Sequence, residues 1–131
     1  MILSEAIRKF VEQPLIARIS VIDDQGYPHT VPIWFVRDGD ELVFFSSRSA
    51  RKIEFVRKNP KGAVGIGGNP YGSEGYLMKG TFTIEEDPGS RWLQEITFRY
   101  EPPELAAQHA REWAGPEIVV MRFTPEKISK I

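Results

Sequence analysis

The sequence predicts a small antiparallel β-barrel whose ends are covered by a few helices. Six runs of strand-forming residues occur, at 15–22, 27–37, 41–47, 61–68, 75–86 and 117–123. Most of them are joined by short turns or by single helices, which is typical of small all-β architectures. A length of 131 residues with 41% apolar residues corresponds to one soluble domain over residues 1–131 with a sizeable core.

Composition argues against several classes of function. The net charge is −1, so no global nucleic-acid or membrane signature is present. The chain has no cysteine and only two histidines, which disfavours a metal centre. It also lacks an apolar run of about 18 residues and a basic, then apolar, leader at its N-terminus. We therefore expect a cytoplasmic protein without metal, nucleic acid or membrane partners.

The first three strands, with tight turns at 24–26 and 38–40, predict an antiparallel meander. The second of them contains Pro28 and Pro32, which cannot donate hydrogen bonds to a sheet. This strand is therefore expected to be an edge strand, or to be bulged near Pro32. Two interpretations stay open: the prolines protect an edge from aggregation, or they leave backbone groups free to meet a ligand.

Four helices are expected around these strands. Ser4 is a plausible N-cap for the first helix, which Pro14 ends. A second runs from Ala50 to about residue 59. Asp87 caps a third, with Pro88 at its first position, and the fourth covers about 104–113.

The strand at 41–47 leads directly into a helix that begins with two cations. The sequence over 44–52 reads FFSSRSARK. With Ser49 as the N-cap, Arg51 and Lys52 fall in the first helical turn, where positive charge opposes the helix dipole at a cost of about 0.3–1 kcal/mol each. Hydroxyls, cations and free backbone N–H groups in one place are the chemistry of an anion site, most simply a phosphate.

The local charge also admits a simpler interpretation. Between residues 48 and 61 there are six cations and one acid, Glu54, whereas the rest of the chain is net acidic. Such a run is also typical of the solvated face of a surface helix. A nucleic-acid module is disfavoured, because only one helix is basic and no aromatic residues alternate with the cations.

Four motifs, taken in order and spacing, carry a family resemblance. They are ARISVIDDQGYPH at 17–29, TVPIWF at 30–35, FSS followed by ARK between 45 and 52, and a strand with Gly80 before TFTI. Together they resemble the pyridoxamine 5′-phosphate oxidase-like proteins, which include FMN-dependent and deazaflavin (F420)-dependent oxidoreductases. The resemblance runs from about Leu15 to Glu86 and is looser over 117–125. It implies a mainly β fold with flanking helices, a six-stranded antiparallel split β-barrel of the FMN-binding type.

The resemblance also implies where a cofactor would bind. In such proteins the phosphate is held by hydroxyls at the end of the third strand and by the Arg-Lys pair that opens the next helix. The ring lies along the second strand, largely on backbone groups. The implied cofactor-binding residues are Thr30, Val31, Pro32, Ile33, Ser46, Ser47, Arg51 and Lys52, with Trp34 nearby.

The function implied is an oxidoreductase that uses FMN, or alternatively F420, to transfer hydride to or from a small organic substrate. The sequence names neither the substrate nor a catalytic residue. The resemblance implies that oxidation of vitamin B6 is disfavoured. The pyridoxamine phosphate oxidases proper usually carry basic residues along the second strand and further Arg and His residues at the C-terminal end, whereas this chain reads TVPIW in the second strand and its last strand ends in MRFTP without histidine. The alternative is a non-catalytic flavin- or heme-binding protein on the same fold.

A homodimer is also expected. Side chains fill the inside of a barrel this small, so a ligand of cofactor size would sit on its surface. A second subunit would complete such a surface groove, which places the cofactor site at the dimer interface.

Overall fold

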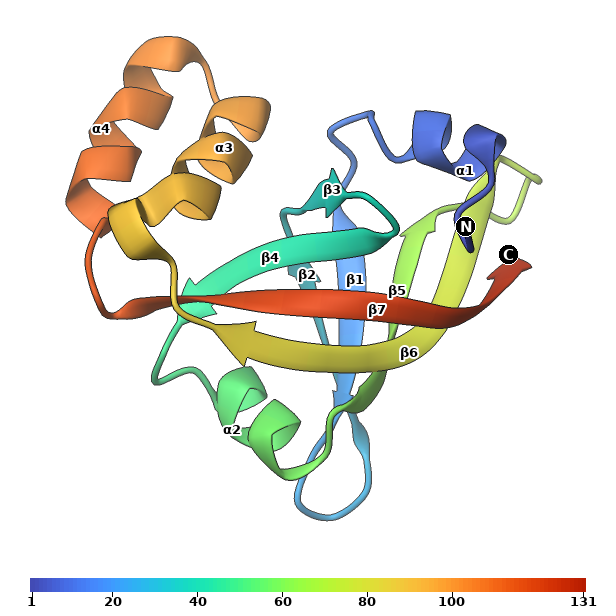
Figure 1. Ribbon diagram of the computed structural model, residues 1–131. Coiled ribbons are helices and arrows are strands. Elements are labelled where there is room, and N and C mark those ends of the chain that lie inside the picture. Colours follow the sequence, from blue (N-terminus) through green and yellow to red (C-terminus); the bar gives the residue numbers. More distant parts are fainter.

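The computed structural model describes all residues, 1–131, as one antiparallel sheet with helices packed around it (Figure 1). The strands are β1 (Ala17–Ile22), β2 (Pro28–Ile33), β3 (Val36–Asp38), β4 (Glu41–Ser47), β5 (Lys61–Gly67), β6 (Gly75–Glu85) and β7 (Ile118–Lys130). The helices are α1 (Glu5–Phe10), α2 (Arg51–Lys58), the short 3-10 helix η1 (Pro88–Ser90), α3 (Arg91–Tyr100) and α4 (Pro103–Trp113). No helix has the length and apolar character that a bilayer crossing requires.

The sheet has the order β2-β1-β5-β6-β7-β4-β3, and every neighbouring pair is antiparallel. It curls so that β4, β7 and β6 run across β1, β2 and β5 (Figure 1). The main core lies between these two layers and contains Ile19 and Val64 from one side and Phe44, Phe82 and Phe123 from the other. The mainly β fold with flanking helices is confirmed, but the sheet has seven strands and is not closed, because β2 and β3 remain edges.

Two details of the expected strand arrangement are wrong. The run predicted at 27–37 divides into β2 and β3, because the buried Phe35 sits between them and its N–H donates to the Tyr100 hydroxyl (3.2 Å). The two predicted turns do join antiparallel pairs, β1 with β2 and β3 with β4, but a continuous meander is wrong, since β2 and β3 lie at opposite edges of the sheet and β4 pairs with β7 on its other side. The prediction that the proline-containing strand is an edge strand is confirmed.

The last strand extends well beyond the run predicted at 117–123. β7 continues beyond residue 123 because β6 supplies pairing partners as far as Lys130, which lies opposite Tyr76. A bulge lies between Lys79 and Gly80. A Cβ built on Gly80 would stand 2.0 Å from the Thr124 carbonyl oxygen, so only glycine lets the two strands approach this closely.

The helix caps follow the sequence in two of three cases. The Ser4 hydroxyl accepts the N–H of Ile7 (3.2 Å), as expected for an N-cap. The Asp87 carboxylate accepts two N–H groups at the start of α3, although η1 comes between them. The Ser49 cap is wrong: Ala50 is the N-cap of α2 and offers no side-chain hydrogen bond.

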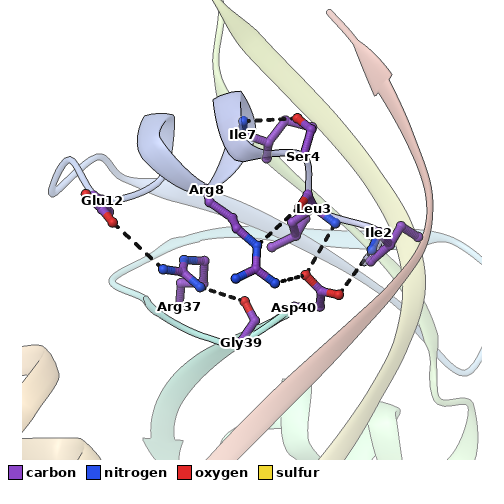
Figure 2. Close-up of polar contacts among 9 residues, drawn as sticks. All are labelled: Ile2, Leu3, Ser4, Ile7, Arg8, Glu12, Arg37, Gly39 and Asp40. Atoms are coloured by element: carbon purple, nitrogen blue, oxygen red, sulfur yellow. Dashed lines mark hydrogen bonds and ion pairs between the residues drawn. The ribbon is translucent and has the colours of Figure 1, made fainter.

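The N-terminal segment is fastened to the turn between β3 and β4 (Figure 2). The Asp40 carboxylate accepts the N–H groups of Ile2 and Leu3 and pairs with Arg8 at 2.5 Å. Burial raises the pKa of Asp40, but the hydrogen bonds, led by that from Arg8, outweigh it, so the pKa is lowered. This clamp closes one end of the core, away from α2 (Figure 1).

Candidate functional site

The four β2 residues implied for ring binding lie on an edge strand. Val31 and Ile33 pack against the main core, whereas Thr30 and Pro32 are exposed. The Thr30 hydroxyl lies 2.8 Å from the hydroxyl of Ser20 on β1. Because β2 has a sheet neighbour on one side only, part of its main chain is free of sheet hydrogen bonds.

A hollow of about 550 Å³ opens where the end of β2 meets β4. Its lining residues are Ile16, Arg18, Pro32, Ile33, Trp34 and Phe45. Four of the six are hydrophobic, and Arg18, the charged one, forms no ion pair in the structure. An apolar hollow with a single cation fits a planar ring that carries polar edges.

The two aromatic walls of this hollow are held from behind by the hairpin of α3 and α4. Trp34 stacks on Tyr100, with ring centroids 5.1 Å apart and an interplanar angle of 4°. Phe45 packs against Trp113 at 6.3 Å. The Tyr100 hydroxyl donates to the Leu15 carbonyl (2.6 Å), which fixes the ring that supports Trp34. Packing against α3 and α4 therefore fixes the two aromatic walls of the hollow.

Sequence reasoning did not place Ile16, Arg18 or Phe45 at the site. Ile16 and Arg18 are exposed residues on either side of the buried Ala17, at the start of β1. Such alternation shows that side chains face outward. It does not show that β2 and β4, which occupy distant places in the sheet order, come close enough to enclose them.

The first turn of α2 presents two cations that have no acid partner. Arg51 is exposed, and its guanidinium lies 5.3 Å from the centroid of the Phe55 ring. Lys52 is half-buried and forms neither a hydrogen bond nor an ion pair through its side chain, and burial lowers its pKa. The N–H of Ile53 is the first in α2 that donates to the Ala50 carbonyl (3.1 Å). Earlier N–H groups are those that a helix cannot satisfy internally.

The two hydroxyls implied for phosphate binding are engaged within the protein. Ser46 is buried, and its hydroxyl donates to the Ser47 carbonyl (3.0 Å). The Ser47 hydroxyl donates to the Glu117 carboxylate (2.6 Å) and lies 3.1 Å from the Ser49 hydroxyl. Sequence reasoning missed Glu117, which is 70 residues further along the chain. In this arrangement Ser47 is not free to donate to a phosphate.

One aromatic residue, Phe55, links β2 to the start of α2. The ring of His29, on β2, contacts the Phe55 ring edge-on at 5.4 Å, and the Arg51 guanidinium lies over the same Phe55 ring. In addition, Phe45 lines the hollow and directly precedes Ser46 in β4. The hollow itself is not lined by Ser46, Ser47, Arg51 or Lys52, so the predicted site consists of two adjacent parts.

These residues fit a flavin or deazaflavin phosphate in part. The unpartnered Arg51 and Lys52 suit a phosphate, and the apolar hollow suits the ring. The Ser47 hydroxyl fits only if it leaves the Glu117 carboxylate. No group of three or more His, Cys, Asp or Glu side chains that could hold a metal occurs in the structure.

Comparison with solved structures supports the fold. An F420 reductase superposes with a TM-score of 0.77 at 22% identity, covering 96% of this chain and 98% of that chain. The General Stress Protein 26 from Bacillus anthracis gives 0.74 at 21% identity, covering 100% and 95%. HutZ, the heme storage protein from Vibrio cholerae, gives 0.72 at 15% identity, covering 98% and 94%.

Sequence comparison gives a more specific result. No curated protein matches the chain. The family model for pyridoxamine 5′-phosphate oxidase, however, matches residues 3–131, which includes the edge strand, the cationic helix start and the final strand described above. The chain therefore belongs to the pyridoxamine 5′-phosphate oxidase family, in which the resemblance of its motifs had placed it.

Proposed function

We propose that this protein is an oxidoreductase that binds FMN, or alternatively F420, and uses it to exchange hydride with a small organic substrate. The observation that carries the proposal is the pair Arg51 and Lys52. Both cations sit at a helix start that disfavours them, neither has an acid partner, and Lys52 is half-buried. Such an arrangement is favourable only with an anion close by.

Relative magnitudes support this interpretation. A charge-assisted hydrogen bond to a phosphate contributes about 1.5–3 kcal/mol. That exceeds the cost of about 0.3–1 kcal/mol for a cation near a helix N-terminus. Two such contacts would therefore make the first turn of α2 favourable in the complex, although it is unfavourable in the protein alone.

The cofactor, once bound, supplies the hydride chemistry. The residues of this chain would bind and orient it. Arg51 and Lys52 would hold the phosphate, and the free backbone of β2 near Pro32 would meet the ring. Phe45 and Trp34 would shield part of the ring from water, and Arg18 could face its polar edge.

The decisive experiment is titration of the purified protein with FMN and with F420, followed by fluorescence and by the visible spectrum. We expect saturable binding of at least one of them. Steady-state oxidation of the reduced cofactor by added acceptors would then separate an enzyme from a carrier. Pyridoxine 5′-phosphate is expected not to be turned over, because β2 lacks basic residues between Thr30 and Ile33. Absence of binding by both cofactors would contradict the proposal.

A second candidate is a heme-binding protein, which the likeness to HutZ brings into consideration. Its iron would need a ligand, and the chain offers His29 on β2 and His109 on α4. His109 is held by Glu101 at 2.7 Å, whereas His29 makes no hydrogen bond through its ring. A hemin titration of the native protein and of His29→Ala separates the two functions, since only a heme protein would lose a Soret shift in the variant.

The proposal includes a homodimer with the cofactor site at the interface. The hollow beside Pro32 opens at the surface, and Ile16 on its rim is 46% exposed. A second copy would cover this apolar rim. Sedimentation or light scattering measures the oligomeric state, and Ile16→Glu is expected to weaken both association and cofactor binding. A monomer that binds cofactor with full affinity would contradict the interface assignment.

A further inference from the structure

The segment before β7 is fastened to the end of β4 by its main chain. The N–H of Arg48 donates to the Glu117 carbonyl at 2.6 Å. The Arg48 guanidinium donates twice to the Pro116 carbonyl, at 2.8 and 3.1 Å, and also pairs with Glu86. Because these bonds fix the backbone on which Glu117 stands, the position of its side chain follows from the fold.

The Glu117 carboxylate lies against two hydroxyls of the β4–α2 loop. One oxygen, Oε1, accepts from Ser47 (2.6 Å) and from Ser49 (3.0 Å). Hydrogen bonds from Ser47 and Ser49, together with the charge of Arg48, hold the pKa of Glu117 below its ordinary value of 4.5. The group is therefore a full anion at neutral pH.

This geometry resembles the way hydroxyls bind a phosphate oxygen, with the carboxylate in the place of the phosphate. A serine hydroxyl has a single hydrogen to donate. While Ser47 and Ser49 donate to Glu117, they cannot donate to a cofactor. The negative charge of Glu117 also repels a second anion that approaches the same loop.

We propose that Glu117 sets the affinity of the cofactor site for phosphate, by keeping Ser47 and Ser49 engaged and leaving Arg51 and Lys52 as the phosphate ligands. This inference rests on the proposed function, because the anion concerned is the phosphate of the cofactor. It differs from the family resemblance, which implies that Ser47 itself binds that phosphate.

The test compares Glu117→Gln with the native protein. The glutamine oxygen can still accept the two hydroxyls, so the loop is retained while the charge is lost. We expect FMN to bind about five- to tenfold more tightly, as removal of a nearby like charge predicts. Riboflavin, which lacks the phosphate, should bind equally to both proteins. Glu95→Gln is the matched control, because it makes the same charge change on an exposed face of α3.

A second pair of variants identifies the hydroxyl. In the native background Ser47→Ala should leave FMN affinity unchanged, since Glu117 occupies that donor. Glu117→Ala releases the Ser47 hydroxyl and should also bind FMN more tightly than the native protein. Adding Ser47→Ala to this variant should remove part of that increase in FMN affinity. Equal FMN affinity of the native protein and Glu117→Gln would overturn the proposal. A loss of FMN affinity in the Ser47→Ala single variant would do so as well.

A cofactor-independent measurement separates this inference from the proposed function. At each concentration of inorganic phosphate the rise in melting temperature should be larger for Glu117→Gln than for the native protein and Glu95→Gln, because tighter binding of phosphate to the folded state stabilises it more. If neither FMN nor F420 binds, the proposed function fails, and the phosphate titration still decides on Glu117. Identical phosphate curves for the three proteins would refute the role of Glu117.

Discussion

Three cations lie between residues 48 and 52, at the junction of β4 and α2. One of them has several polar partners within the protein, and the other two have none. Arg48 is fully engaged, with the Glu86 carboxylate and the Pro116 carbonyl around its guanidinium. Arg51 contacts only the Phe55 ring, and the side chain of Lys52 has no polar partner although it is half-buried. The same local charge in the sequence therefore serves two purposes in the fold.

The difference separates structural from functional charge. A cation with ion-pair and hydrogen-bond partners, such as Arg48, stabilises the folded protein even when no ligand is bound. Unbonded cations at a helix start slightly destabilise it and gain only from a ligand. Substitution of Arg48 should lower the stability of the protein without lowering its affinity for the cofactor. Substitution of Arg51 or Lys52 should lower the affinity for the cofactor without lowering the stability.

The largest expected effect is on cofactor affinity. Arg51→Ala or Lys52→Ala should raise the Kd for FMN at least tenfold, because one lost charge-assisted contact corresponds to about a decade or more. The melting temperature without ligand should be unchanged or slightly higher, since each variant relieves an unfavourable charge at the start of α2. Fluorescence titration and thermal unfolding of the same preparations provide both measurements.

Lys61→Ala is the matched control for these variants. Lys61 is an exposed cation of the same basic run and has no acid partner within ion-pair distance. It lies at the start of β5, beyond the far end of α2, so its removal should not change the Kd. If Lys52→Ala lowered the melting temperature and left the affinities for FMN and F420 unchanged, the pair would be structural and the comparison would fail.

A smaller and opposite effect is expected at Arg48. Arg48→Ala removes the ion pair to Glu86 and both hydrogen bonds to the Pro116 carbonyl, so the melting temperature should fall. Exposed pairs of this kind contribute little, so the fall should amount to a few degrees at most. FMN affinity should not decrease. A loss of affinity as large as that of Lys52→Ala would show that the bonded cation is also a ligand contact.

The sequence could predict features that depend on neighbouring residues. The strand at 41–47 has the predicted bounds, and Arg51 and Lys52 do open the helix that follows it. Edge placement of β2 followed from Pro28 and Pro32 alone. These outcomes depend on propensity, turn residues and proline chemistry, all of which act over a few residues.

Features that depend on distant residues could not be predicted. The prediction that Ser49 is the N-cap was wrong because its hydroxyl donates to Glu117, which is far along the chain. The strand at 27–37 divided because Tyr100 takes the Phe35 N–H. The hollow depends on β2 and β4 approaching each other across an open sheet, which no local pattern reports. Tertiary contacts decided each of these cases.

The smallest effect expected from the comparison is a pH dependence that belongs to Lys52. Because burial lowers its pKa below the ordinary 10.5, the unfolded chain binds more protons than the folded one between the lowered value and 10.5. Its contribution to the free energy of unfolding therefore rises with pH across that window. Lys52→Met should melt slightly higher than the native protein at neutral pH, and the gap should narrow as the pH approaches 10.5. A high concentration of phosphate should also narrow the gap at neutral pH, since a bound anion gives the ammonium its missing partner and stabilises the native protein more than the variant, which keeps only Arg51. A gap that stays constant with pH and phosphate would mean that Lys52 is solvated and has no role in anion binding.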